Sequence, residues 1–461
     1  MTAPALGRRG FALVAFAASV TMLVRLWEGD LFRDEVLYAA IAKGVAVRGE
    51  WLDLWVGDTP YWNKPPLVFW LVAATFRVLG TTVLAAKLVP ALFGILSCVA
   101  LYAIARRLTD ERLALLAGLV LATTPRFVRT SATFRLDSAV TFFTLWSLWA
   151  YVRGAEDGRR GAFLTAGLAW GLGVMAKGVF GLTGPYLFLI WCAVMGRLRV
   201  VATWPFVASV LVGAAVCLPW HLWEVHRWGA PFVDVYLRRQ VIGRMAGELW
   251  HGPAQSYFAV LLKDDWLWVA FLALGVVSAA ARAWRGDRRV LFVLCWAAGY
   301  LALLYASQGR RARYLLQFYP PAAVLTALGI ARVVPAAWLA RLPRAATVAF
   351  AAAAVVLLVV PIPLHSSPQR DLRALRPVLD RLDGGTQAPV DGFREMSPNG
   401  RGAFLFYLDR DLHGYPTIPA LRRGTAPLVV AKPDAALVLD RHGWERLFTN
   451  ARYVVFRRPG R

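Results

Sequence analysis

The sequence predicts an all-α polytopic membrane domain of about eleven transmembrane helices, followed by a small α/β domain. Three observations support this fold class. The chain of 461 residues is 58% hydrophobic with a mean hydropathy of +0.50, whereas an ordinary soluble domain is about half apolar. Its apolar residues form repeated runs that approach the ~20 residues needed to cross a bilayer. Beyond residue 366 these runs end, and short apolar stretches alternate with polar ones.

Apolar length and the placement of Lys and Arg together assign the spans and their direction. Arg8 and Arg9 place the N-terminus in the cytoplasm, and we interpret the first apolar run as a retained helix and not a cleaved signal peptide. The predicted spans are 11–27, 84–105, 111–128, 138–152, 161–176, 179–195, 203–223, 256–281, 290–306, 314–331 and 345–362. With this assignment every basic cluster between spans except one lies in the cytoplasm, as the positive-inside rule favours.

The stretch 28–83 is then expected outside the cytoplasm, with two helices, 34–47 and 65–79, lying along the membrane surface. The second of these is strongly apolar, but at about 15 residues it is short for a span. If it crossed the bilayer, the basic clusters that follow would fall on the opposite side. The charge pattern therefore favours a first outer loop with two juxtamembrane helices.

One basic cluster, 308–314, is expected on the outer face. Basic residues on that side oppose the positive-inside rule, so their presence there suggests a function. The same face is expected to collect further charged and polar groups. The candidate site residues on this face are the acids Asp34, Glu35 and Asp137, together with Lys64, Lys177, Arg244, Arg310, Arg313 and Tyr314.

Lys64 stands immediately before Pro65 and Pro66. Two prolines begin a helix and hold the preceding backbone extended. Lys64 is thereby held beside the free N–H groups of a helix start, where an anion binds well. Asp34 and Glu35 are also compatible with a plain helix start, because acids suit the positive end of a helix. A carboxylate paired with an anion-binding lysine suggests an acid–base step beside a phosphate.

Other classes of function are less compatible with the sequence. The net charge of +24 would suggest nucleic acid in a soluble protein, but here the arginines lie between spans, and we expect no nucleic-acid partner. The four cysteines all lie in apolar runs without metal-site spacing, so we interpret them as core residues. His221 and His226 are five residues apart and do not share one helix face.

The C-terminal residues 366–461 are expected to form a small extracytoplasmic α/β domain that acts as a lid or docks the acceptor. Leucines at helical spacing predict a helix over 369–382. The predicted strands are 403–408, 427–431, 435–439 and 453–456. The domain contains no catalytic motif.

The sequence resembles a known family along residues 10–330. The most specific motifs are the Asp34–Glu35 pair with Tyr38, Lys64-Pro65-Pro66 and Leu136-Asp137, and the supporting ones are MAKG at 175–178 and RYLLQFYPP at 313–321. These motifs are similar to those of the lipid A 4-amino-4-deoxy-L-arabinose transferases and the protein O-mannosyltransferases. Both are GT-C-type glycosyltransferases that use polyprenyl-phosphate-linked sugars.

The resemblance implies a role for several residues of this chain. Asp34 matches the essential carboxylate, which acts on the acceptor nucleophile as base or orienter. Lys64 matches the residue that holds the lipid phosphate, and Asp137 matches a second acid. Arg244 looks like the arginine of an outer loop, and Tyr314 like a tyrosine on the phosphate side.

The family implies sugar transfer from a polyprenyl phosphate to a lipid, polysaccharide or protein, at the outer face of a bacterial inner membrane. The chain departs from the arabinose transferases at Leu37, where they usually have Arg, and at Asn63, where they usually have Glu. The sugar, the acceptor, the link to lipid A or another envelope glycan, and a divalent metal therefore stay open. The alternatives are a flippase for an anionic polyprenyl-linked lipid and a non-catalytic scaffold.

Overall fold

The computed structural model describes residues 7–27, 29–248, 255–359, 369–395 and 397–459. They divide into two compact units, which we describe separately. The first comprises residues 1–26, 62–68 and 87–362, and the second comprises residues 27–61, 69–86 and 363–461. The predicted domain boundary between residues 365 and 366 lies outside the described residues.

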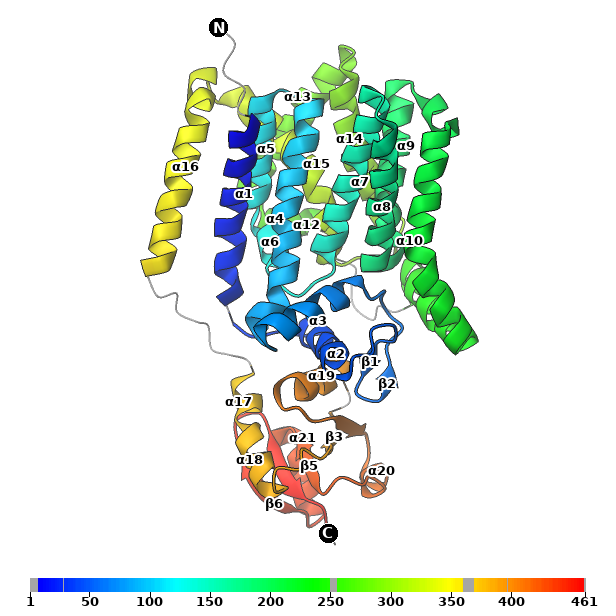
Figure 1. Ribbon diagram of the computed structural model, residues 1–461. Coiled ribbons are helices and arrows are strands. Elements are labelled where there is room, and N and C mark those ends of the chain that lie inside the picture. The colour runs from blue at the N-terminus through cyan, green and yellow to red at the C-terminus, as the bar shows by residue number, and fades with distance from the viewer. Residues whose placement is uncertain (1–6, 28, 249–254, 360–368, 396, 460–461) are drawn as a thin grey trace. The chain divides into compact units, whose positions relative to one another are not determined.

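A helix stands at each predicted span of the membrane domain (Figure 1). These helices are α1 Gly7–Leu23, α4 Val83–Leu108, α5 Glu111–Thr123, α7 Asp137–Asp157, α8 Arg160–Lys177, α9 Thr183–Met195, α10 Trp204–Trp228, α13 Trp266–Trp284, α14 Arg288–Tyr305, α15 Tyr319–Val333 and α16 Ala336–Val359. The shorter helical elements between them are η1 Val24–Trp27, α6 Pro125–Ser131, η2 Gly178–Leu182, η3 Leu198–Ala202, α11 Ala230–Val233, η4 Asp234–Gly243, α12 Tyr257–Asp264 and η5 Ala312–Phe318.

Length and composition alone qualify a smaller number of these helices as spans. Within the described residues, seven helical stretches are long and apolar enough to cross a membrane, or eight if α5 and α6, bent by 63°, form one broken span. The difference arises because α8 and α9 count as one stretch, α1 is only 17 residues long, α5 counts only together with α6, and α7 does not qualify. The prediction of a polytopic helical membrane domain is confirmed.

Small residues allow the helices of this unit to pack closely. A Cβ atom added at Gly171 of α8 would lie 2.7 Å from the backbone oxygen of Gly213 on α10. A Cβ atom at Gly329 of α15 would lie 2.8 Å from the backbone nitrogen of Gly275 on α13. Membrane helices have no hydrophobic driving force between them, so this close backbone approach supplies van der Waals contact instead.

Each of two predicted spans is divided into two helices. The prediction of one helix over 256–281 was wrong, because α12 ends at Asp264 and α13 begins at Trp266. The Asp265 carboxylate accepts hydrogen bonds from Arg126 N (3.0 Å) and Tyr319 Oη (2.6 Å). The span predicted over 111–128 likewise ends at Thr123, since Pro125 begins α6.

The two predicted helices of the first outer loop are confirmed as helices. They are α2 Asp34–Arg48 and α3 Leu67–Leu79, whose residues from 69 onward belong to the second unit. Between them, β1 (Trp55–Val56) pairs with β2 (Thr59–Pro60) across a turn in which Gly57 has φ 62°. The Phe69 ring packs at 5.5 Å from the Tyr38 ring and at 6.1 Å from the Tyr61 ring. Their position at a membrane surface stays a prediction.

The C-terminal residues form the predicted α/β fold. The helices are α17 Arg370–Arg373, α18 Leu375–Leu382, α19 Pro398–Tyr407, α20 Ile418–Arg422 and α21 Pro433–Arg441. The strands are β3 Val390–Phe393, β4 Leu412–Tyr415, β5 Leu428–Ala431, β6 Glu445–Thr449 and β7 Val454–Arg457. They form one sheet in the order β4-β3-β5-β7-β6. In it β3 is parallel to β4 and β5, and β7 is antiparallel to β5 and β6.

Two of the four predicted strands were wrong. The stretch 403–408 lies mostly in α19, where Ser397 Oγ caps the helix by accepting from Gly400 N at 2.9 Å. The stretch 435–439 lies in α21, which Pro433 begins at a position where a missing N–H costs nothing. In both cases a proline at the helix start was a stronger signal than the apolar run. The strands predicted at 427–431 and 453–456 are confirmed as β5 and β7.

The α2 helix packs against α19 within the second unit. Lys43 Nζ donates to the backbone oxygens of Leu405 (3.2 Å) and Phe406 (2.9 Å) at the end of α19, and it forms an ion pair with Asp409. Gly402 lies so close to α2 that an added Cβ atom would be 2.7 Å from Leu37 Cα. The helix that begins with Asp34 is therefore fixed to the C-terminal fold.

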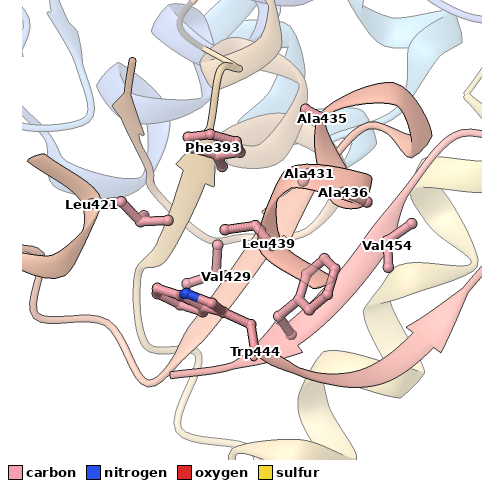
Figure 2. Close-up of a cluster of buried hydrophobic side chains, with 10 residues drawn as sticks. Phe393, Leu421, Val429, Ala431, Ala435, Ala436, Leu439, Trp444 and Val454 are labelled. Atoms are coloured by element: carbon pink, nitrogen blue, oxygen red, sulfur yellow. The ribbon is translucent and has the colours of Figure 1, made fainter. Parts of the chain in front are cut away.

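The core of the C-terminal fold is a buried apolar cluster between the sheet and α21 (Figure 2). Leu439 on α21 is fully buried there beside Val429 of β5 and Phe456 of β7, while Leu437 on the same helix is 58% exposed. We predict that Leu439→Ala lowers the opening free energy of the β5 and β7 amides by about 2–5 kcal/mol, because it leaves a cavity. Hydrogen exchange on the full chain in detergent measures this.

Leu437→Ala is the matched control, and it should change the same amides by no more than about 0.5 kcal/mol. Equal effects of the two substitutions would contradict the packing described for α21.

Candidate functional site

Lys64 lies in the first unit, in the short segment that leads into α3. Pro65 and Pro66 after it are buried, and the surrounding protein shields most of Lys64 from water. Asn63 Oδ1 accepts a hydrogen bond from Gln240 Nε2 at 2.9 Å, which ties the segment to η4. The position of Lys64 is thus set on one side by two rigid prolines and on the other by a contact with a distant loop.

Asp137 and Lys177 form a buried ion pair. Asp137 begins α7 and Lys177 ends α8, so the antiparallel packing of these helices brings the two side chains to the same end. Their side chains are only 7% and 9% exposed, respectively. Arg159 and Arg160, which join the two helices, lie at the opposite end of the pair.

Three basic side chains surround Tyr314 on η5. Arg244, directly after η4, donates from Nη1 to Tyr314 Oη at 3.0 Å. The Lys177 ammonium lies 5.2 Å from the centre of the Tyr314 ring, and the Arg313 guanidinium lies 5.7 Å from it. These distances are within the range of cation–π attraction, which partly offsets the repulsion among the cations.

The positive charges act together on Lys64. Its pKa is held well below the usual range, first because burial removes water and then because Arg244, Lys177 and Arg313 repel its charged form. Asp137 opposes this shift. Within the described residues of the first unit, four basic side chains therefore share one electrostatic environment with the Asp137 carboxylate, and this concentration of basic groups favours binding of an anion.

The structure brings six of the nine predicted site residues together in the first unit: Lys64, Asp137, Lys177, Arg244, Arg313 and Tyr314. Arg310 lies nearby in sequence but packs over the ring of Tyr305, at 5.3 Å from its centre. Asp34 and Glu35 belong to the second unit, where they begin α2 and Glu35 is buried. The expected approach of Asp34 to Lys64 stays a prediction.

Sequence reasoning missed the part that Gln240 plays in positioning the site. Asn63 drew attention only as a departure from the family pattern, although an amide side chain beside Lys64 is a good partner for a second amide. A contact between residues 63 and 240 depends on how η4 folds back, and no local pattern in the sequence reports that.

A second group of charges at helix ends of this unit is balanced and needs no ligand. Arg126 Nε donates to Asp264 Oδ2 at 2.6 Å, and Arg129 donates to the same carboxylate at 3.0 Å. Asp265 beside it accepts from Arg126 N and Tyr319. By contrast, the cluster around Tyr314 contains four bases, of which Lys177 is paired with Asp137.

The cluster around Tyr314 does not fit a divalent metal ion. The Asp137 carboxylate is already paired with Lys177, and the neighbouring Arg244 and Arg313 would repel a metal ion. The one group of potential metal ligands among the described residues is Asp58, Asp411 and His413 in the second unit. There Arg401 donates to Asp411 from Nε (2.6 Å) and Nη2 (2.7 Å) and pairs with Asp58, so a guanidinium already balances both acids.

Three comparisons place this geometry among known proteins. Residues 63–223 match the family model of dolichyl-phosphate-mannose-protein mannosyltransferases. The chain is similar to the undecaprenyl phosphate-α-4-amino-4-deoxy-L-arabinose arabinosyl transferase of Pseudomonas aeruginosa, with 29% identity over 332 residues, 69% of this chain and 59% of that protein. The corresponding protein of Erwinia tasmaniensis is 27% identical over 66% of this chain and 55% of its own length.

The solved structures decide the fold. ArnT from Cupriavidus metallidurans bound to undecaprenyl phosphate matches with a TM-score of 0.74 and 18% identity, covering 98% of each chain. The chain has a GT-C-like fold. An oligosaccharyltransferase from Archaeoglobus fulgidus matches with a TM-score of 0.60 and 12% identity, over 92% of this chain and 69% of that one. The resemblance inferred from the sequence motifs is confirmed.

The matches cover different shares of the relatives and of the solved structures. The chain spans about three fifths of the length of the curated relatives, whereas it covers nearly all of the C. metallidurans structure. The family model includes Lys64, Asp137 and Lys177 but ends before Arg244. The apolar helices and the relatives together support a multi-pass protein of a bacterial inner membrane.

The lowered pKa of Lys64 predicts that anion binding takes up a proton. In the empty site burial and the neighbouring cations favour neutral Lys64, and a bound phosphate dianion favours its charged form. Lys64 takes up this proton at pH values between its lowered pKa in the empty site and its higher pKa in the occupied site. Affinity for a short alkyl phosphate should therefore fall as pH rises through this window. Calorimetry in buffers of different ionisation enthalpy measures the protons exchanged.

Lys64→Arg is the control, because arginine stays charged throughout this range. This variant should bind the phosphate without uptake by residue 64, and any uptake that remains belongs to the phosphate itself. Identical proton exchange in the two proteins would contradict the electrostatic description of the site.

Proposed function

We propose that the chain is a membrane glycosyltransferase that moves a sugar from a polyprenyl-phosphate donor to an acceptor at the outer face of the membrane. The observation that carries this proposal is the cluster of Lys64, Lys177, Arg244 and Arg313 around Tyr314, with its excess of positive charge at the ends of apolar helices. The GT-C-like fold and the names of the relatives support the same class of donor.

In the proposed reaction the acceptor oxygen attacks the anomeric carbon of the sugar, and the bond from that carbon to the phosphate oxygen breaks. The polyprenyl phosphate leaves with the bonding electron pair. Lys64 and the arginines stabilise its growing negative charge, as preorganised cations do in a site with little water. Attack from the side opposite the phosphate inverts the configuration of the sugar. The sugar arrives on lipid, so the reaction needs no nucleotide.

Asp34 takes the proton of the acceptor hydroxyl or orients it, with Glu35 and Asp137 as the other carboxylates of the centre. Within the second unit, the helix that begins with Asp34 is held by Lys43 and Gly402 against α19. This contact gives the C-terminal domain a proposed role, in which it sets the position of the acceptor base and docks the acceptor. The acceptor is an envelope lipid, polysaccharide or protein.

The charge pattern supports an orientation with the N-terminus in the cytoplasm. Arg159 and Arg160 lie at the end of the α7–α8 pair opposite to Asp137 and Lys177. The positive-inside rule favours the arginine-rich end as the cytoplasmic one. The candidate site then opens to the outer face, together with the C-terminal domain, where a lipid-linked sugar meets an envelope acceptor.

Asp34→Asn should lower transfer by about 10²–10⁴-fold, because it removes a general base. The assay incubates purified protein with labelled polyprenyl-phosphate sugar and an envelope extract, and it measures released polyprenyl phosphate. Glu50→Gln is the control, since Glu50 is exposed in the same outer loop, and it should leave the rate unchanged. Near-normal activity of Asp34→Asn removes Asp34 from the mechanism. Lipid movement without cleavage by the unaltered protein supports the flippase instead.

Lys64→Ala should weaken donor binding by about 10- to 100-fold, because a charge-assisted hydrogen bond to phosphate contributes roughly 1.5–3 kcal/mol. The effect appears in the KM for the labelled donor and in direct binding of polyprenyl phosphate. Lys263→Ala removes an exposed lysine of α12 and serves as the control. Unchanged kcat and KM in Lys64→Ala would contradict its assigned role.

A further inference from the structure

The first unit contains a second basic cavity, separate from the cluster around Tyr314. It has a volume of about 1100 Å³ and lies where α1, α5 and α16 begin. Its basic lining residues are Arg9, Arg112, Arg341 and Arg344. The chain turns from α4 into α5 at this end, and α5 and α6 then lead to the other end, where α7 begins and α8 ends.

The arginines of this cavity are available to a ligand. Among the residues that the structure describes, none of the four has a carboxylate within 4.0 Å. The two acids in the lining are already engaged. Asp110 Oδ1 accepts from the N–H groups of Arg112 (2.9 Å) and Leu113 (3.0 Å), and Glu111 Oε1 accepts from Tyr102 Oη (3.0 Å) and Gly7 N. The lining has a formal excess of two positive charges.

An apolar chamber continues from this cavity between the helices. A second cavity of about 190 Å³ shares Asp110, Arg112, Leu339 and Pro343 with the first. It extends to Leu115 and Leu116 on α5 and to Ala331 on α15. A cationic mouth above an apolar interior matches an amphiphile whose head is anionic and whose tail is hydrocarbon.

The α16 helix, which lines the cavity, has little protein around it. Only 6% of the apolar window of α16 is buried, against 67% for α4 and 89% for the stretch that contains α15. The α16 helix packs beside α1 (Figure 1), and residues of its first turns line the cavity. A molecule that fills this space would bury apolar surface of α16 and satisfy the arginines at its start.

We propose that this cavity binds one anionic phospholipid of the surrounding bilayer, with its phosphate among Arg9, Arg112, Arg341 and Arg344 and an acyl chain toward Leu115 and Leu116. Arginines that snorkel to a membrane interface are common, but a cavity large enough for a lipid head among four of them is a built site. Basic pockets between transmembrane helices bind two-phosphate lipids well, and the excess of two positive charges matches diphosphatidylglycerol.

The test compares lipid retention by the full chain and by a double variant, Arg341→Gln with Arg344→Gln. Purified protein in mild detergent is mixed with diphosphatidylglycerol or phosphatidylcholine, and native mass spectrometry counts bound lipid. The unaltered protein should retain one diphosphatidylglycerol, with phosphatidylcholine binding much more weakly. The double variant should bind diphosphatidylglycerol on the order of twentyfold more weakly, from about 1 kcal/mol for each arginine lost.

Two further variants make the result specific to the cavity. Arg199→Gln with Arg285→Gln removes two exposed arginines outside the cavity and should leave retention unchanged. Leu339→Trp fills the apolar space with all charges kept, and it should reduce retention as the arginine variant does. Equal retention of the two lipids, or unchanged retention in both cavity variants at unchanged thermal stability, overturns the proposal.

Discussion

Mutual repulsion of basic side chains is the constraint on which the candidate site depends. Lys64, Lys177, Arg244 and Arg313 share one environment with the carboxylate of Asp137. Such an arrangement lowers stability in the empty protein, since like charges held out of water repel one another. Pro65, Pro66 and the Asn63–Gln240 hydrogen bond position Lys64, while Tyr314 contacts Lys177, Arg244 and Arg313. A site held in this way has its anion-binding geometry before the ligand arrives, and the cost of ordering it does not reduce affinity.

The membrane domain was largely predictable from the sequence because two strong signals agree there. Apolar length locates the helices, and arginine placement orders them, so a helix stands at every predicted span. The breaks were less predictable. Asp265 interrupts a helix because Arg126 and Tyr319, far away in the chain, bond its carboxylate. Such contacts are tertiary, and no window of neighbouring residues reports them.

The small C-terminal fold illustrates the opposite case. Its elements are short, and an apolar run of five or six residues fits a strand or a helix equally well. Leu439, Ala435 and Ala436 face the core at helical spacing, but their run was interpreted as a strand although Pro433 precedes it. The individual site residues were named largely from their resemblance to a family. Their charge excess could be predicted from the sequence, whereas the role of Tyr314 as their common neighbour required the fold.

The contact between α2 and α19 limits how the second unit can vary. Lys43 reaches three groups at the end of α19, and Gly402 leaves no room for a side chain against Leu37. The sequences of α2 and of the C-terminal fold must therefore change together. A chimaera that exchanges only residues 369–459 with a relative would place a foreign surface under α2 and misalign the segment that carries Asp34. Exchange of acceptor preference between relatives would thus require transplanting the outer loop and the tail domain as one module.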